Sequence, residues 1–267
     1  MLHALARPQA DRAWLITHDD EVLDAATALA FTTLCQRRAA GEPLAYIVGS
    51  KAFFGLELQV DKRVLVPRPD TETLVEWALA LANTFHLPHP PVNSLHIVRR
   101  VLDMGTGSGA IALALKHSLP QWEVSALDAT SDALAVAKKN AKRLNLNVNF
   151  VQSAWFSALG GENLERPQFD LIVSNPPYIV EGDPHMATLS HEPKQALTSG
   201  GDGLDDIRQI IAQSPQFLTS GGWLLLEHGY DQAAAVRDLL TQRGFANVQS
   251  KLDLAGIERC TGGQFRG

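Results

Sequence analysis

Beyond Val98, short apolar runs alternate with segments of helical periodicity, and this alternation constrains the fold more than any other feature of the sequence. The apolar runs cover residues 98–102, 123–127, 148–151, 169–174, 222–227 and 248–252, and the helical segments cover residues 110–117, 131–144, 207–217 and 231–240. This pattern predicts a mostly parallel sheet with helices on both faces. In such sheets ligands bind at the carboxyl ends of the strands, so the residues that follow the strands are the candidate site residues.

The chain before Val98 is organised differently. Residues 1–43 have apolar positions at helical spacing and end at Gly41-Glu42-Pro43, which stops a helix. Residues 44–48 and 53–60 have the composition of short strands and predict a small hairpin. We therefore expect three parts, namely a helical domain over 1–43, a β-hairpin linker over 44–67 and a larger domain over 68–267.

The composition excludes several classes of protein. The net charge of −6 over 267 residues argues against a chain that coats nucleic acid, since such domains are usually basic. Cys35 and Cys260 form neither a metal-type spacing nor a disulfide framework, so a reducing cytoplasm is the simplest setting. We expect no metal site, because His86 and His89 lack a third ligand, and no membrane-spanning segment, because no apolar stretch approaches the required length.

A glycine-rich loop follows the first predicted strand of the larger domain. The sequence Asp103-Met104-Gly105-Thr106-Gly107-Ser108-Gly109-Ala110 leads from a strand into a helix, and glycine lets a ligand approach the backbone closely. The spacing also satisfies the dinucleotide pattern, so a nicotinamide cofactor is one interpretation and a plain strand-to-helix turn is another. The carboxylate at Asp103 is a poor neighbour for a pyrophosphate and favours a cationic ligand that carries ammonium and sulfonium groups.

Asp128 ends the second predicted strand of this domain. An acidic side chain at this place can accept hydrogen bonds from both hydroxyls of a ribose. Nicotinamide dinucleotides and S-adenosylmethionine both contain such a ribose, so Asp128 supports a nucleoside ligand without choosing one. The alternative role is a helix cap, for which we expect Ser131 to be the better residue.

The turn Asn175-Pro176-Pro177-Tyr178 follows the predicted strand 169–174. Two consecutive prolines make the turn rigid and remove two backbone donors. The Asn175 side-chain oxygen and the Pro176 carbonyl can then hold both hydrogens of a planar NH2 group, while Tyr178 offers its ring to a flat group or a cation. These features suit methyl transfer to an amide or aryl amine, for which in-line positioning suffices. The alternative is a proline turn that merely ends a strand.

At these motifs the chain resembles the HemK/PrmC-type release factor glutamine methyltransferases. The resemblance is carried by residues 41–47, 67–72, 103–110, 174–179, 192–193 with 196–197, 201–205 and 226–229. It implies a class I, Rossmann-like S-adenosylmethionine-dependent methyltransferase sheet of seven strands with a helical N-terminal domain. It also implies methylation of the glutamine amide nitrogen in the Gly-Gly-Gln motif of peptide chain release factors, which modulates translation termination.

The resemblance assigns roles to particular residues. The implied cofactor contacts are Gly105, Thr106, Gly107, Ser108, Gly109, Asp128, Trp155 and Asn175; the implied catalytic residues are Asn175, Pro176 and Tyr178; and the implied substrate contacts are Asn175, Pro176, Pro177 and Tyr178. From spacing alone, Trp155 would be a core aromatic residue. Arg68 either approaches the acceptor or pairs with an acid in the hairpin. Residues 180–203, which include Glu192, are interpreted as a lid over the site, and the alternative for Glu192 is a solvated carboxylate in a loop.

Three features depart from the family pattern. Ala154 stands where many relatives have Asp, which removes one polar contact to adenine. The helical domain looks shortened. The C-terminal segment contains Gly262-Gly263-Gln264, which we expect to be a disordered tail rather than a target of self-methylation.

Other functions remain open at this point. A ribosomal-protein glutamine methyltransferase is the nearest alternative, and a nucleic-acid amino-methyltransferase would use the same turn on a flipped base. A nicotinamide-dependent oxidoreductase would leave the Asn-Pro-Pro-Tyr turn unexplained. We expect S-adenosylmethionine as cofactor, release factors as partners, no nucleic-acid substrate, no membrane association, a monomer and a cytoplasmic location.

Overall fold

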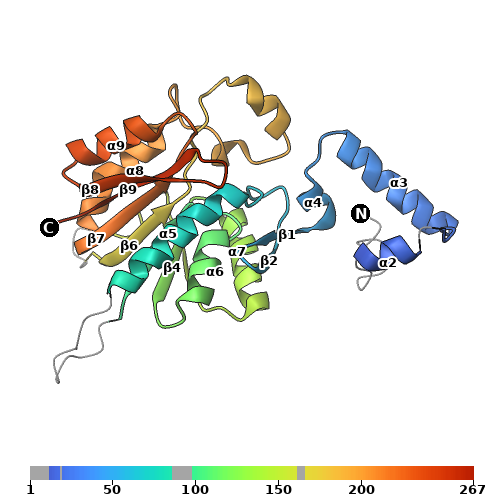
Figure 1. Ribbon diagram of the computed structural model, residues 1–267, viewed down its shortest axis with the longest axis horizontal. Coiled ribbons are helices and arrows are strands. Elements are labelled where there is room, and N and C mark those ends of the chain that lie inside the picture. Colours follow the sequence, from blue (N-terminus) through green and yellow to red (C-terminus); the bar gives the residue numbers. More distant parts are fainter. Residues whose placement is uncertain (1–11, 19, 86–97, 161–165) are drawn as a thin grey trace.

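A seven-stranded sheet forms the centre of the computed structural model, which describes residues 12–18, 20–85, 98–160 and 166–267 (Figure 1). Its strands are β3 (Arg100–Met104), β4 (Glu123–Asp128), β5 (Asn149–Gln152), β6 (Phe169–Ser174), β7 (Leu218–Glu227), β8 (Ala246–Leu252) and β9 (Glu258–Gln264). The strand order is β5-β4-β3-β6-β7-β9-β8, in which β9 runs antiparallel to both of its neighbours and the other pairs are parallel. The order reverses between β3 and β6, so a ligand crevice is expected at the carboxyl ends of these two strands.

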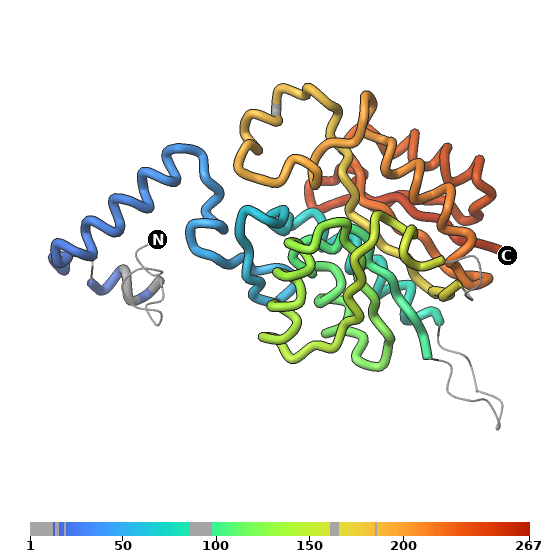
Figure 2. The backbone as a smooth tube through the Cα atoms, turned by 180° about the vertical axis from the view of Figure 1, so that it is seen from behind, coloured from blue at the N-terminus to red at the C-terminus, as the bar shows by residue number. Residues whose placement is uncertain are grey.

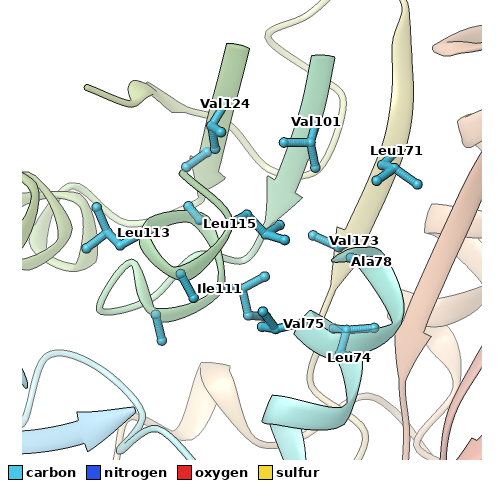
Figure 3. Close-up of a cluster of buried hydrophobic side chains, with 14 of the residues drawn as sticks. Leu74, Val75, Ala78, Val101, Ile111, Leu113, Leu115, Val124, Leu171 and Val173 are labelled. Atoms are coloured by element: carbon cyan, nitrogen blue, oxygen red, sulfur yellow. The ribbon is translucent and has the colours of Figure 1, made fainter. Parts of the chain in front are cut away.

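Helices cover both faces of this sheet, as the alternation of segments predicts. The helices α5 (Glu72–Ala82), α6 (Ala110–Ser118) and α7 (Ser131–Leu144) lie on one face, and α8 (Asp205–Gln213) and α9 (Ala233–Gln242) lie on the other (Figure 1). Alternate strand residues supply the two cores: Val101 and Leu171 pack toward α5 and α6, whereas Leu102 and Ile172 pack toward α8 and α9. Figure 3 shows the first core, in which side chains of α5 and α6 meet those of β3, β4 and β6.

The helix α7 has its cap one residue before the predicted one. The Thr130 hydroxyl, not that of Ser131, accepts a hydrogen bond from the Ala133 amide at 3.2 Å. The prediction of Ser131 as the cap is therefore wrong. The extended backbone of Thr130 gives it the geometry that a capping residue needs.

The segment 44–48 is the helix α4 (Leu44–Val48), so its prediction as a strand is wrong. A short apolar run fits a strand or a helical turn equally well, and here Pro43 precedes the turn while Gly49, at φ 80°, ends it. The hairpin consists instead of β1 (Ser50–Phe53) and β2 (Leu56–Gln59). The Asn140 side chain of α7 bonds both the amide and the carbonyl of Gln59, which fixes the hairpin to the larger domain.

Before α4, the described part of the chain forms the helices α2 (Arg12–Thr17) and α3 (Ala25–Ala39), which confirm the helical prediction for the part of 1–43 that the structure describes. The structure describes all of α3, and within it no residue is buried. Figure 2 shows that both helices stand apart from the sheet. The division of the chain at residues 43 and 67 stays a prediction. Among the described residues, no helix is both long and apolar enough to cross a membrane.

The C-terminal Gly-Gly-Gln lies in β9, in the interior of the sheet between β7 and β8, so the prediction of a disordered tail is wrong. Gly262 and Gly263 have no side chain, and both faces of the sheet are packed too tightly at these positions to admit one. A Cβ atom on Gly262 would lie 2.5 Å from Leu225 Cδ2 and 2.8 Å from the Trp77 ring, and one on Gly263 would lie 2.9 Å from Phe245 Cβ. The glutamine is not a free target either, since its side-chain amide donates to the Gly221 carbonyl at 3.0 Å.

Candidate active site

A cavity of about 220 Å³ lies at the carboxyl ends of β3, β4 and β6. It is lined by Arg63, Val64, Leu65, Gly105, Gly107, Asp128, Ala129, Thr130, Ala133, Ser153, Ala154, Trp155, Asn175, Pro177, Pro193, Gln195, Ala196 and Asp206. These residues come from the linker, the glycine loop, the ends of β4 and β5, the Asn-Pro-Pro-Tyr turn, the proposed lid and the start of α8. Segments far apart in the sequence therefore converge on one cavity at the place where the strand order reverses.

The glycine loop borders the cavity with its backbone. Gly105 and Gly107 have φ angles of 72° and 54°, which glycine adopts without strain. A Cβ atom on Gly107 would meet no described atom within 4 Å, so this residue faces open space. The loop is held in place by a hydrogen bond of 2.8 Å from the Thr106 amide to the Leu127 carbonyl. The result is an exposed backbone surface against which a ligand can lie.

Asp103 lies beneath this loop and is fully buried. Its Oδ2 atom accepts hydrogen bonds from the Thr106 hydroxyl at 2.7 Å and from the Ala112 amide at 3.1 Å. Its Oδ1 atom has no partner among the described residues. Burial raises the pKa of Asp103 to about 7, and these two hydrogen bonds oppose that rise. Asp103 therefore supports the shape of the loop rather than lining the cavity.

Asp128 both supports the loop and lines the cavity. Its Oδ2 atom accepts a hydrogen bond of 2.9 Å from the Gly107 amide, and its Oδ1 atom accepts one from the Thr130 amide at 2.9 Å. The Thr130 hydroxyl also donates to Oδ1 at 3.1 Å, so one of the about four acceptor positions of this carboxylate remains for a further donor. Its position at the end of β4 agrees with the prediction that it accepts ribose hydroxyls, which stays a prediction.

Trp155 forms one wall of the cavity in a strained backbone conformation. Its φ angle is 51°, a region that residues other than glycine rarely occupy. The indole Nε1–H donates to Asp206 Oδ1 at 3.0 Å, and the ring lies over Gly105. Such strain persists only where the surroundings enforce it, and it is common at functional sites. The ring is thus fixed as a flat wall beside the glycine loop.

The Asn-Pro-Pro-Tyr turn is fixed from several sides. The Ser174 hydroxyl, just before the turn, donates to the Met104 carbonyl at 2.7 Å, which joins the ends of β6 and β3. The Asn175 Nδ2 atom donates to Thr71 Oγ1 at 3.2 Å. Among the described residues, no donor is bonded to Asn175 Oδ1 or to the Pro176 carbonyl. The turn therefore offers two unused acceptors, and Asn175 borders the cavity.

The segment 180–203 contributes Pro193, Gln195 and Ala196 to the cavity wall. Its Glu192 is buried and pairs with the Arg68 guanidinium at 2.5 Å, while its second oxygen accepts from the Val66 amide at 3.1 Å. The alternative of a solvated Glu192 is therefore excluded. One interpretation of Arg68 was an ion pair with an acid in the hairpin. Arg68 does form an ion pair, but its partner is Glu192 in the segment 180–203.

The predicted site residues separate into two groups. Gly105, Gly107, Asp128, Trp155, Asn175 and Pro177 line the cavity, and Thr106, Ser108, Gly109, Pro176 and Tyr178 do not. Thr106, Ser108 and Pro176 are buried, and Gly109 packs closely against α7, where a Cβ atom would lie 3.3 Å from Ala137 Cβ. Tyr178 directs its hydroxyl toward Glu227. The functional roles of all these residues stay predictions.

Sequence reasoning missed several residues around the cavity. Val64 and Leu65 line it beside Pro67-Arg68, and Asp206 fixes the Trp155 ring. The sequence does point to Val64 and Leu65, since they lie close to residues 67–72, a segment that carries the family resemblance. No sequence signal connects Asp206 with Trp155. Among the described residues, no group of three or more His, Cys, Asp or Glu side chains is arranged to hold a metal ion.

Comparisons with known proteins agree with this architecture. A family model described as the methyltransferase small domain matches residues 84–204, and one described as the PrmC N-terminal domain matches residues 2–49. A relative from Vibrio cholerae called release factor glutamine methyltransferase is 45% identical over all of this chain and 87% of its own length. A relative of the same name from Pseudomonas aeruginosa is 48% identical over 98% of this chain and 89% of its own.

Solved structures support the same fold. The hMettl16 catalytic domain matches with a TM-score of 0.62 at 18% identity, over 97% of this chain and 94% of that chain. The 16S rRNA N2 G1207 methyltransferase of Thermus thermophilus matches with a TM-score of 0.55 at 21% identity, over 81% of this chain and 50% of that chain. At such identities the likeness concerns the fold alone, and it confirms the expected class I, Rossmann-like methyltransferase sheet.

Proposed function

This chain belongs to the family of release factor glutamine methyltransferases, and from that premise we propose that it methylates the glutamine side-chain nitrogen in the Gly-Gly-Gln motif of peptide chain release factors. The methyl donor is S-adenosylmethionine. The observation that carries the proposal is the pair of unused acceptors, Asn175 Oδ1 and the Pro176 carbonyl, beside a cavity with a glycine-loop wall. A primary amide has two N–H groups on one nitrogen, which is the complement of such a pair.

The residues around the cavity fit S-adenosylmethionine. The open space at Gly107 admits the ligand to the backbone, and the Asp128 carboxylate can accept from ribose hydroxyls. The fixed Trp155 ring and the apolar Val64 and Leu65 suit a flat adenine. When bound, S-adenosylmethionine supplies an electrophilic methyl group on a sulfonium, and the carboxylates in and beneath the wall suit a ligand with positive charge.

The Asn-Pro-Pro-Tyr turn provides the chemistry at the acceptor. An amide nitrogen is a poor nucleophile because its lone pair is delocalised into the carbonyl. Two acceptors that bind its hydrogens orient the NH2 group and increase the electron density on nitrogen. The rigid prolines hold both acceptors in place before the substrate arrives, which is the form of positioning that contributes most to transfer reactions.

We also propose that the partner is a folded release factor, that the enzyme acts as a cytoplasmic monomer, and that nucleic acid is not a substrate. The net charge of −6 supports the last point, since nucleic-acid enzymes usually present a basic surface. The exposed helix α3 offers an element for docking a protein substrate away from the cavity.

The test is methyl transfer from labelled S-adenosylmethionine to a purified release factor, a ribosomal protein and DNA, assayed side by side. The matched control is the same release factor with the Gly-Gly-Gln glutamine replaced by alanine. We expect label only on the intact release factor, and mass spectrometry should place it on that glutamine. Label on the ribosomal protein or on DNA, but not on the release factor, would refute the proposed substrate.

A further inference from the structure

A buried carboxylate lies behind the Asn-Pro-Pro-Tyr turn and does not line the cavity. Glu227 ends β7, next to β6, and is 1% exposed. Its Oε2 atom has no partner by strict geometry among the described residues. Burying an ionisable group without a full set of partners costs stability, so a positional or chemical role is the natural reason for its presence.

Both polar side chains of the turn connect to this carboxyl group. The Tyr178 hydroxyl lies 3.5 Å from Glu227 Oε1, and burial raises the pKa of Tyr178, so the hydroxyl keeps its proton. Asn175 connects indirectly: its Nδ2 atom donates to Thr71 Oγ1 at 3.2 Å, and the Thr71 hydroxyl lies near enough to the Glu227 carboxyl to lower the pKa of that group. Glu227 is thus the common end of two branches that begin at Asn175 and Tyr178.

The hydroxyl of Thr71 is free for this connection. Thr71 precedes α5 and is 4% exposed, yet its side chain makes no capping hydrogen bond to that helix. A hydroxyl has one hydrogen to donate. When Thr71 gives it to the Glu227 carboxylate, its oxygen can only accept from Asn175.

This direction of hydrogen bonding sets the orientation of the Asn175 amide. Nδ2 must face Thr71, so Oδ1 is left as the outward acceptor. The flipped amide would place its oxygen against the Thr71 oxygen and present an NH2 group to the NH2 group of a substrate. A carboxylate in the interior therefore determines which atom of Asn175 meets the acceptor amide.

This direction requires the ionised form of Glu227, in which the carboxyl group can only accept hydrogen bonds. Burial raises the pKa of Glu227 to about 7, while the Thr71 hydrogen bond and the Arg259 guanidinium lower it and Asp70 raises it. Arg259 itself lies 3.5 Å from Asp70 and 3.4 Å from Asp253.

We propose that Thr71 and Glu227 are positioning residues that fix the Asn175 amide with Oδ1 toward the acceptor nitrogen. The proposal rests on the proposed function, because it assumes an amide substrate at this turn. Neither residue lines the cavity, so both act through Asn175 and Tyr178 rather than through contact with the ligands.

The experiment compares Thr71→Val with Thr71→Ser in the full chain. Valine matches threonine in shape but lacks the hydroxyl, so kcat should fall about tenfold, as expected for the loss of one oriented hydrogen bond. The dissociation constant for S-adenosylmethionine should change less than about twofold. Thr71→Ser keeps the hydroxyl and should restore most of kcat. Thr241→Val, at an exposed threonine of α9, is the matched control and should leave kcat unchanged.

A double-mutant cycle tests the role of Glu227. Glu227→Gln introduces an N–H donor where the carboxylate only accepts, and it should lower kcat. In the double variant with Thr71→Val, the fold-loss in kcat should be smaller than the product of the two single fold-losses. Full kcat in Thr71→Val, equal losses in Thr71→Val and Thr71→Ser, or losses that multiply in the double variant would each overturn the inference. Failure of the wild-type enzyme to methylate release factor would instead refute the proposed function, so the two failures are distinguishable.

Discussion

At the scale of single residues, Asp128 is the side chain through which the glycine loop and the cavity are coupled. It accepts hydrogen bonds from Gly107 and Thr130 and borders the space that the cofactor is proposed to fill. Hydrogen bonds to a charged group contribute about 1.5–3 kcal/mol each. We expect Asp128→Ala to weaken S-adenosylmethionine binding by one to two orders of magnitude, measured by titration calorimetry.

The control for that prediction is Asp238→Ala, at an exposed aspartate of α9, which should bind the cofactor like the wild type. Circular dichroism should show that both variants stay folded. Unchanged affinity in Asp128→Ala would remove this residue from the cofactor site.

A second prediction at this scale concerns pH. Burial raises the pKa values of Asp103 and Glu227 to about 7, above their values in the unfolded chain. Between pH 4.5 and 7 the folded state therefore holds more protons than the unfolded state, and the free energy of unfolding falls as pH rises. In Glu227→Gln we expect the free energy of unfolding to fall less steeply with pH. The melting temperature of this variant should therefore rise relative to that of the wild type between pH 5.5 and 8. A constant difference between the two melting curves across this range would contradict the assignment.

At the scale of elements, Glu192 joins the segment 180–203 to the end of the linker, through the Val66 amide, and to Arg68 just beyond the linker. Both segments also line the cavity, so their contact closes it on one side. Arg68→Gln leaves Glu192 buried with a weaker partner, which is costly for a charge. We expect about tenfold weaker S-adenosylmethionine binding and faster proteolysis within 180–203. If both properties match those of the wild type, the pair does not hold this wall of the cavity.

The same scale shows what sequence patterns can and cannot predict. The helix α7 and the strand β6 have the predicted bounds, because strong apolar periodicity and tertiary packing agree there. The strand β9 was missed because adjacent glycines disfavour a strand, and only the packing of Trp77, Leu225 and Phe245 on its two faces requires them.

The candidate site was predictable where its residues follow strands. Gly105, Asp128 and Asn175 line the cavity because the carboxyl ends of parallel strands meet at one edge of the sheet. The network behind Asn175 was not predictable, since Thr71 lies 104 positions away and reaches Asn175 only through the packing of α5. Contacts of this kind leave no periodic trace in the sequence.

At the scale of the whole molecule, the N-terminal helices are separate from the cavity. The structure describes all of α3, in which no residue is buried, and the Ala40 carbonyl just after this helix lies 3.1 Å from His191 Nε2 in the segment 180–203. We expect deletion of residues 1–43 to preserve S-adenosylmethionine binding and to abolish methylation of a whole release factor. Calorimetry and methyl-transfer assays on the same preparation measure the two effects. Normal methylation by the truncated protein would show that these helices do not dock the substrate.

The central claim of this account is that Asn175 and Pro176 hold the two hydrogens of a glutamine amide in line with the methyl donor. The most direct measurement is single-turnover methylation of a release factor by Asn175→Ala and Asn175→Asp, with the product located by mass spectrometry. Loss of one preorganised polar contact should slow Asn175→Ala by about 10²–10³-fold, and Asn175→Asp should bind cofactor normally yet turn over slowly. Wild-type rates in Asn175→Ala, or methyl groups on a residue other than the Gly-Gly-Gln glutamine, would contradict the claim.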